Sequence, residues 1–187
     1  VFWPGLTLGA TPIGNMGDLP PRALATLKAA DAVLCEDSRT TGAMLTRLGV
    51  QARLIPLHDH NEATQLPQIM EMLARGQSLA LVSDAGTPLV SDPGFRLVRA
   101  AHAHDIDVSP IPGASAVTAA LSTAGIPTDR FCFEGFVPSK HVARMSWLEN
   151  LANERFRSYA RCQSIGIVDL LVESVSTFFE CSFRESS

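Results

Sequence analysis

The chain has 187 residues, of which 46% are hydrophobic and 18% are charged. This length allows one well-formed core, or one domain and part of a second. A net charge of -4 gives no global basic field, so any contact with nucleic acid has to be local. No apolar run approaches the ~18 residues of a membrane span, and no signal peptide precedes the first predicted strand. We therefore expect a cytoplasmic protein without a membrane contact.

The four cysteines are Cys35, Cys132, Cys162 and Cys181. They form no CxxC pair and show no spacing typical of metal ligands. The sequence therefore predicts free or buried thiols in a reducing cytosol, rather than disulfides or a zinc site.

Short apolar runs alternate along the chain with segments of helical periodicity. Strands are predicted at residues 6–10, 32–35, 53–57, 78–82 and 108–111. Helices are predicted at residues 21–29, 41–48, 62–75, 95–104 and 115–124, several of them ending at a glycine. This alternation predicts an α/β fold, in which helices flank an open, mostly parallel sheet with right-handed crossovers.

The pattern starts again beyond residue 125. Residues 131–133 resemble a new strand, and residues 142–153 resemble a helix. We therefore predict an N-terminal α/β domain over residues 1–125 and the beginning of a second, incomplete α/β domain over residues 126–187.

The unusual residues all follow the predicted strands. The five segments are, in chain order, "ATPIGN", "EDSRT", "HDHNE", "SDAGTPLVSDPG" and "PGASA". Ligands of open α/β sheets bind in the crevice beyond the carboxyl ends of the strands. Glycine and proline are also ordinary turn residues, so one such loop would mean little. Five together predict a ligand site.

The loop at residues 83–94, "SDAGTPLVSDPG", indicates the kind of ligand. Its small residues and glycines let a ligand lie against main-chain amides. Asp84 and Asp92 add acceptors for ribose hydroxyls or an ammonium group, which suits a nucleoside that carries an amino-acid tail. "GATPIGN" has the glycine spacing of a phosphate loop, but Asn15 replaces its lysine. That difference, with the absence of G-x-G-x-x-G, argues against nucleotide hydrolysis and against a Rossmann NAD site.

These segments, followed by "PTDRFCFEGFVP", stand in the order found in the bacterial 16S ribosomal RNA ribose 2'-O-methyltransferases that act on cytidine. The chain resembles this family, a branch of the tetrapyrrole-methylase-like superfamily, from about residue 6 to residue 154. The resemblance implies a two-domain α/β enzyme, usually a homodimer. It also implies S-adenosylmethionine bound between the domains and methyl transfer to a cytidine ribose in the small ribosomal subunit.

The resemblance also implies a set of cofactor-binding residues. Matched by position, they are Pro12, Ser83, Asp84, Gly86, Thr87, Pro88, Leu89, Val90, Pro112, Ser115 and Ala116. These positions are small, apolar or rich in exposed backbone, which suits packing against an adenine and binding through the main chain.

Transfer of a methyl group to a hydroxyl depends on positioning and on removal of the hydroxyl proton. The candidate bases are Glu36, Asp37, His58 and His60, although capping of a loop also explains each histidine. Candidate RNA contacts are Arg39, Lys140 and Arg144, which ordinary surface positions would explain equally well.

The resemblance stops before the end of the chain. Relatives continue with a strand close to "FYESPHR", which residues 156–187 lack. Residues 167–175, "IVDLLVESV", keep a trace of the helix expected next. We interpret the tail after about residue 156 as truncated or frameshifted, with a divergent second domain as the alternative. A shortened second domain would leave one side of the cofactor cleft incomplete, which predicts weak cofactor binding and little activity.

Two other functions stay open. The chain is alternatively a non-catalytic remnant that binds nucleosides weakly or not at all. A metal-dependent phosphohydrolase would use oxygen and nitrogen ligands from the loops, namely Glu36, Asp37, His58, Asp59, His60, Asp84 and Asp92.

Overall fold

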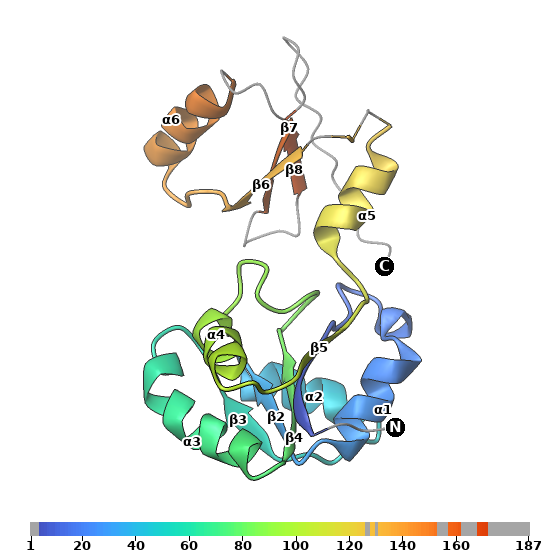
Figure 1. Cartoon of the computed structure of the whole chain (residues 1–187). Coiled ribbons are helices and arrows are strands. Elements are labelled where there is room, and N and C mark those ends of the chain that lie inside the picture. The colour runs from blue at the N-terminus through green and yellow to red at the C-terminus, as the bar shows by residue number, and fades with distance from the viewer. Residues whose placement is uncertain (1–3, 126–127, 130, 153–156, 162–167, 172–187) are drawn as a thin grey trace. The chain divides into compact units, whose positions relative to one another are not determined.

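The computed structural model describes residues 4–125, 128–129, 131–152, 157–161 and 168–171 (Figure 1). The chain divides into two compact units, Val1–Ser115 and Ala116–Ser187. The helix α5 (Ala116–Thr123) falls in the second unit, whereas the sequence analysis assigned it to the first domain. The domain boundary at residue 125 stays a prediction.

The first unit is built on a parallel sheet. Its strands are β1 (Gly5–Gly9), β2 (Ala32–Cys35), β3 (Leu54–Pro56), β4 (Ser78–Val82) and β5 (Val108–Ile111). They lie in the order β3-β2-β4-β1-β5, and every neighbouring pair is parallel. The predicted fold class is therefore confirmed, and three of these strands, β2, β4 and β5, begin and end where the sequence predicted.

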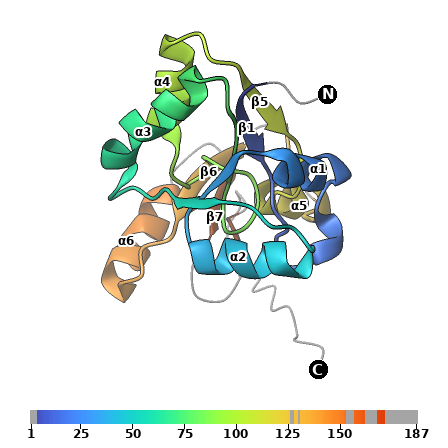
Figure 2. The ribbon, with the colours of Figure 1, turned by 90° about the horizontal axis from the view of Figure 1, so that it is seen from below.

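Helices cover both faces of this sheet (Figure 2). They are α1 (Pro21–Ala29), α2 (Ser38–Arg47), α3 (Glu62–Ala74) and α4 (Phe95–Ala103), with a short 3₁₀ helix at Met16–Asp18 before α1. Leu79 and Leu81 of β4 belong to the same core cluster as residues of α3 and α4, while Ala80 and Val82 pack with residues of α1 and α2. Burial on both faces explains why β4 is apolar from Leu79 to Val82.

The strand order places β1 and β4 side by side, although the segments that follow them lead to opposite faces of the sheet. The chain after β1 goes to α1 on one face of the sheet, and the chain after β4 goes to α4 on the other. Such a reversal of strand order is a topological switch point, where ligands of open α/β sheets bind. The loop at residues 83–94 and the loop that follows β1 are therefore the candidate ligand-binding loops.

The start of α2 differs from the prediction. The sequence predicted a helix over residues 41–48, but α2 begins at Ser38. Asp37 is its N-cap, and the Asp37 carboxylate accepts a hydrogen bond of 2.8 Å from the Arg39 amide. This cap satisfies one of the amides that a helix start leaves unpaired. Part of "EDSRT", predicted as a loop, is therefore the first turn of a helix.

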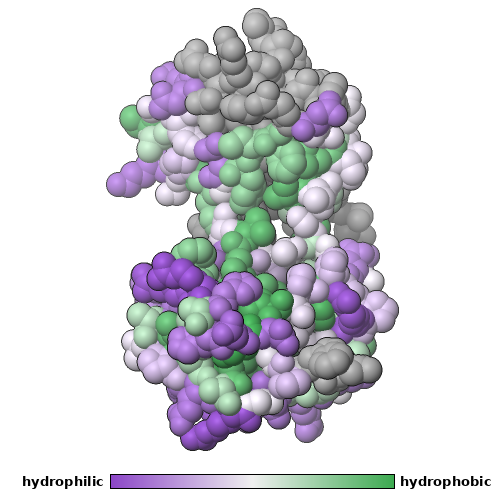
Figure 3. All heavy atoms as spheres, in the orientation of Figure 1, coloured by the Kyte–Doolittle hydropathy of each residue, from purple (hydrophilic) through white to green (hydrophobic). Residues whose placement is uncertain are grey.

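The second unit contains α5, β6 (Phe131–Phe136), α6 (His141–Ala152), β7 (Arg157–Arg161) and β8 (Val168–Leu171). Its sheet has the order β6-β7-β8, with a parallel and then an antiparallel pair. The strand and helix predicted after residue 125 are confirmed. Figure 3 shows apolar surface on the visible face of this unit, and the exposed large apolar side chains among its described residues are Phe131, Phe136, Val142 and Met145.

The tail prediction is tested only in part. Residues 168–171 form the strand β8, so the interpretation of residues 167–175 as a trace of a helix is wrong for that part. Residues 162–167 and 172–187 lie outside the described residues. Within the residues that the structure does describe, no helix combines the length and apolar character needed to cross a membrane.

A buried carboxylate joins α3 to α4. Glu62, the first residue of α3, is buried, and Glu62 Oε1 accepts a hydrogen bond of 3.0 Å from the Leu97 amide. Leu97 is the third residue of α4, whose N-cap, Gly94, has no side chain to cap the helix. Glu62 therefore caps α4 from another helix and fixes the end of the 83–94 loop.

We expect Glu62→Ala to lower the free energy of unfolding by about 1–3 kcal/mol, because it leaves the buried Leu97 amide without an acceptor. Glu62→Gln keeps an acceptor oxygen and should cost less. Urea denaturation measures both. Glu71→Ala on the exposed side of α3, which removes only a surface ion pair with Arg75, is the control and should change stability little. Equal effects at positions 62 and 71 would contradict the capping role.

Candidate functional site

Two loops are joined across the switch point by a backbone bridge. Thr11, after β1, donates its amide to Gly86 O at 2.9 Å, and the Gly86 amide donates to Thr11 O at 3.1 Å. Side chains reinforce the bridge, since Thr11 Oγ1 donates to Ser83 O and Ser83 Oγ donates to Gly86 O, both at 3.0 Å. Thr11 and Ser83 are buried. The 83–94 loop therefore has one defined position over the ends of β1 and β4.

The loop after β5 joins the same assembly. Thr87 Oγ1 donates to Ala114 O at 3.3 Å. Gly113 lies so close to its neighbours that an added Cβ would stand 2.8 Å from Ala10 Cβ and 2.9 Å from Pro20 Cγ. A side chain at position 113 would therefore push this loop away from β1.

Gly86 has a structural part in this site. Its φ is +88°, a conformation that residues with a side chain rarely adopt, and an added Cβ would lie 3.4 Å from Ile13 Cγ2. Both of its backbone polar groups bind Thr11. Gly86 therefore holds the shape of the loop, while its neighbours are left to present groups to a ligand. Leu89 and Ser91 also have positive φ, 69° and 63°, and such strain is concentrated at functional sites.

The remaining predicted cofactor residues occupy different surroundings. Pro88 is buried, Pro12, Asp84 and Leu89 are half-buried, and Val90 and Pro112 are exposed. Ser115 ends the first unit, and Ala116 begins α5 in the second. The structure thus brings Pro12, Ser83 and Thr87 to one edge of the sheet, and the part that Ala116 plays stays a prediction.

Glu36, directly after β2, is half-buried among carboxylates. Burial raises the pKa of Glu36, and the negative charges of Asp84, Asp92, Asp59 and Asp37 raise it further. Burial also raises the pKa of Asp84, against the hydrogen bond that Asp84 accepts from the Asp37 amide. Acidic side chains from the loops after β2, β3 and β4 therefore influence one another, and their negative potential favours a cationic ligand.

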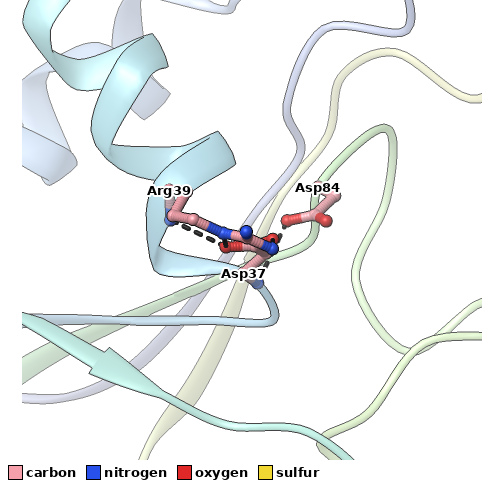
Figure 4. A network of polar contacts seen from close by, with 3 residues as sticks. All are labelled: Asp37, Arg39 and Asp84. Atoms are coloured by element: carbon pink, nitrogen blue, oxygen red, sulfur yellow. Dashed lines mark hydrogen bonds and ion pairs between the residues drawn. The ribbon is translucent and has the colours of Figure 1, made fainter.

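Asp37 has a different role from its neighbour (Figure 4). Arg39 Nη2 donates to Asp37 Oδ2 at 2.8 Å, and Arg39 Nε donates to Asp37 Oδ1 at 3.2 Å. These bonds and the Arg39 amide lower the pKa of Asp37 to about 2 and raise the pKa of Arg39. The Asp37 amide donates to Asp84 Oδ1 at 3.2 Å, which ties α2 to the 83–94 loop. Asp37 is therefore a poor base, and its structural role is to cap α2 and connect that helix to the 83–94 loop.

The two histidines lie in the turn before α3. Their ring centroids are 6.1 Å apart. The His58 amide donates to Asn61 Oδ1 at 2.8 Å, and His58 Nδ1 is buried without a hydrogen-bond partner among the described residues. His60 is exposed. Part of "HDHNE" is thus a turn held by the Asn61 side chain, and the roles of the two histidine rings stay predictions.

The predicted RNA contacts are dispersed. The Arg39 side chain is 91% exposed, although its guanidinium binds Asp37. Lys140 is exposed just before α6, and Arg144 is half-buried within α6, in the second unit. Sequence reasoning missed Thr11 and Glu62. Thr11 belongs to "ATPIGN" and Glu62 to "HDHNE", but no local signal shows that Glu62 reaches the Leu97 amide.

The described residues contain no group of three His, Cys, Asp or Glu side chains that could hold a metal ion. The phosphohydrolase hypothesis therefore has no ligand set in that part of the chain. Cys35 and Cys132 are free thiols, as predicted. Cys162 and Cys181 lie outside the described residues.

An open α/β unit with small-residue loops at its switch point defines a class of ligand-binding domains. Within that class, the sequence model of the family described as Tetrapyrrole (Corrin/Porphyrin) Methylases matches residues 6–166. The chain belongs to this family, and the family resemblance seen in the sequence is confirmed.

Curated relatives match the same region. A protein of Xylella fastidiosa (strain Temecula1), named Ribosomal RNA small subunit methyltransferase I, is 54% identical over 149 residues, which is 80% of this chain and 55% of the relative. A protein of the same name from Escherichia coli O157:H7 is 49% identical over 144 residues, 77% of this chain and 50% of the relative. The chain spans about half the length of the curated relatives it matches.

Solved structures support the fold. A diphthine synthase superposes with a TM-score of 0.62 at 18% identity, covering 85% of this chain and 64% of that one. The methyltransferase CobJ gives 0.59 at 23% identity, covering 86% and 68%. At this identity the likeness extends to the fold alone.

The raised pKa of Glu36 predicts a pH dependence. A carboxyl whose folded-state pKa lies above its unfolded value contributes stability below the unfolded pKa, ~4.3, and loses it as pH rises through the folded pKa. We therefore expect Glu36→Gln to be more stable than the wild type at pH 7, with the difference vanishing below about pH 4. Urea denaturation across this pH range measures the effect.

The control for this experiment is Asp18→Asn, which removes one exposed carboxylate of the first unit. It should leave the pH profile unchanged. A Glu36→Gln protein that is less stable than the wild type at pH 7 would contradict the electrostatic account of Glu36.

Proposed function

We propose that this chain forms one side of the cofactor-binding site of an S-adenosylmethionine-dependent methyltransferase. The methyl acceptor in this proposal is a ribose 2'-hydroxyl of a cytidine in 16S ribosomal RNA. The observation that carries the proposal is the Thr11–Gly86 bridge, which fixes the 83–94 loop at the switch point of a methylase-family fold. Support for the RNA comes from relatives about half identical to this chain, whose name is ribosomal RNA small subunit methyltransferase I.

The residues present fit this cofactor. The loop around Gly86 and Thr87 and the loop at residues 112–115 are small and backbone-rich, which suits an adenine packed against main chain. Glu36, Asp84 and Asp92 supply negative potential for the sulfonium and ammonium charges of the cofactor. When bound, S-adenosylmethionine supplies an electrophilic methyl group.

In this proposal Glu36 accepts the proton of the ribose hydroxyl. Its raised pKa brings a carboxylate closer to working pH, where a general base is most effective. Asp37, held by Arg39, stays ionised and positions the first turn of α2 next to Asp84. Glu36 is the base that its surroundings favour, and exposed His60 is the second candidate.

The proposed partners follow from the substrate. Arg39, Lys140 and Arg144 remain the proposed RNA contacts. The intact enzyme would act on the small ribosomal subunit in the cytoplasm, as a homodimer.

We expect Gly86→Val to weaken S-adenosylmethionine binding by about tenfold or more while the protein stays folded, because a branched side chain distorts the loop against Ile13. Isothermal titration without divalent metal measures the affinity. The control is Gly76→Val, since Gly76 has a similar φ of +76° but nothing within 4 Å of an added Cβ. Equal affinities in the wild type and a folded Gly86→Val protein would remove this loop from the pocket.

We expect this chain to transfer a labelled methyl group only weakly to small ribosomal subunits that lack the modification, because its second domain is shortened, and we expect Glu36→Gln to lower that transfer further. Removing a general base should lower the rate by about 10²–10⁴-fold. Cofactor binding without transfer would instead identify a non-catalytic remnant. Phosphate release that depends on a divalent metal would favour the phosphohydrolase.

A further inference from the structure

The exposed side of α4 combines an aromatic ring with arginines. The Phe95 side chain is 65% exposed, and Arg96 and Arg99 are exposed beside it. The Arg99 Cζ lies 5.6 Å from the centroid of the Phe95 ring. Neither arginine forms an ion pair with any residue that the structure describes. We call Phe95, Arg96 and Arg99 the α4 platform.

The charge of this surface is local. The sequence of α4, FRLVRAAHA, contains no acidic residue, although the whole chain has a net charge of -4. The space-filling view shows strongly hydrophilic surface over α4 (Figure 3). A lone exposed phenylalanine needs no explanation. A phenylalanine under an unpaired guanidinium, with a second arginine beside it, is the combination that stacks a base and contacts its phosphate.

The platform is held rigidly at the edge of the proposed site. Phe95 is the first residue of α4 and directly follows the 83–94 loop. Glu62 caps the Leu97 amide, and Gly94, at φ +118°, is packed so that an added Cβ would stand 2.7 Å from Leu81 Cδ2. The other end of the same loop is fixed to Thr11. A nucleotide stacked on Phe95 would therefore lie at a constant distance from the 83–86 turn.

The cap also decides which groups meet the ligand. A helix start normally attracts phosphate through its free amides. Here the Glu62 carboxylate already occupies the third amide and brings a negative charge to that end. This charge disfavours an anion at the start of α4, so we assign phosphate binding to the arginine side chains of the platform.

We propose that the α4 platform stacks an unpaired nucleotide of the RNA substrate, with the Phe95 ring under the base and Arg99 and Arg96 at the adjoining phosphates. This inference rests on the proposed function, because it takes an RNA as the substrate. It adds contacts distinct from Arg39, Lys140 and Arg144, and it places them on the same edge of the sheet as the 83–94 loop.

The test is binding of a labelled single-stranded oligoribonucleotide by the whole chain. Phe95→Leu keeps an apolar side chain but removes the ring, so affinity should fall about 5- to 100-fold, whereas Phe95→Trp should retain it. Arg99→Gln should reduce the slope of log affinity against log salt by about 0.7, the value for one phosphate contact on a single strand. Phe95→Leu should leave that slope unchanged.

Arg53→Gln is the matched control, because Arg53 is exposed just before β3, at the opposite edge of the sheet. It should change neither affinity nor slope at this site. Wild-type affinity in Phe95→Leu would overturn the stacking role, as would absence of RNA binding by the wild-type chain. Titration of S-adenosylmethionine into the same variants separates the two proposals. If the cofactor binds normally and substitutions of Phe95 leave RNA affinity unchanged, only the platform is refuted. If the wild-type chain binds neither the cofactor nor RNA, the proposed function is refuted.

Discussion

The pair of hydrogen bonds between Thr11 and Gly86 is the constraint on which the rest of the site depends. β1 and β4 lie side by side, but the chains that leave them go to opposite faces of the sheet. Without a link, nothing in the strands themselves would hold the two loops together. The bridge satisfies buried backbone groups that could not stay unpaired, and it thereby gives the 83–94 loop one position.

The surroundings of Glu36 and Asp37 give these two neighbouring carboxylates different pKa values. Arg39 and the first turn of α2 occupy Asp37, which stays ionised with a pKa of about 2. Glu36, one residue earlier, has no comparable cation among the residues that the structure describes, and burial and its acidic neighbours raise its pKa. Mutual repulsion of this kind destabilises the free protein and is relieved by a cationic ligand. Functional sites commonly depart from the most stable arrangement in this way.

α4 connects the site to the surface beside it. Leu97 and Ala101 anchor the helix in the core with the leucines of β4, while Glu62 and Gly94 fix its first turn. The exposed side is thereby free to carry Phe95, Arg96 and Arg99 without a structural task. A rigid helix next to a rigid loop is the arrangement that positions a long substrate against a reacting group.

The amino-acid sequence by itself determined the alternation of strands and helices, because hydrophobic periodicity and terminal glycines are local signals. It also located the five loops that follow the strands, and hence the edge of the sheet where the site lies. Tertiary structure alone decided the strand order, the Thr11–Gly86 bridge and the cap that Glu62 places on α4, since each joins residues that are far apart in the sequence. Tertiary structure also gave Glu36 and Asp37 different roles. Neighbouring carboxylates look alike in a sequence, and only burial and a nearby arginine give them different pKa values.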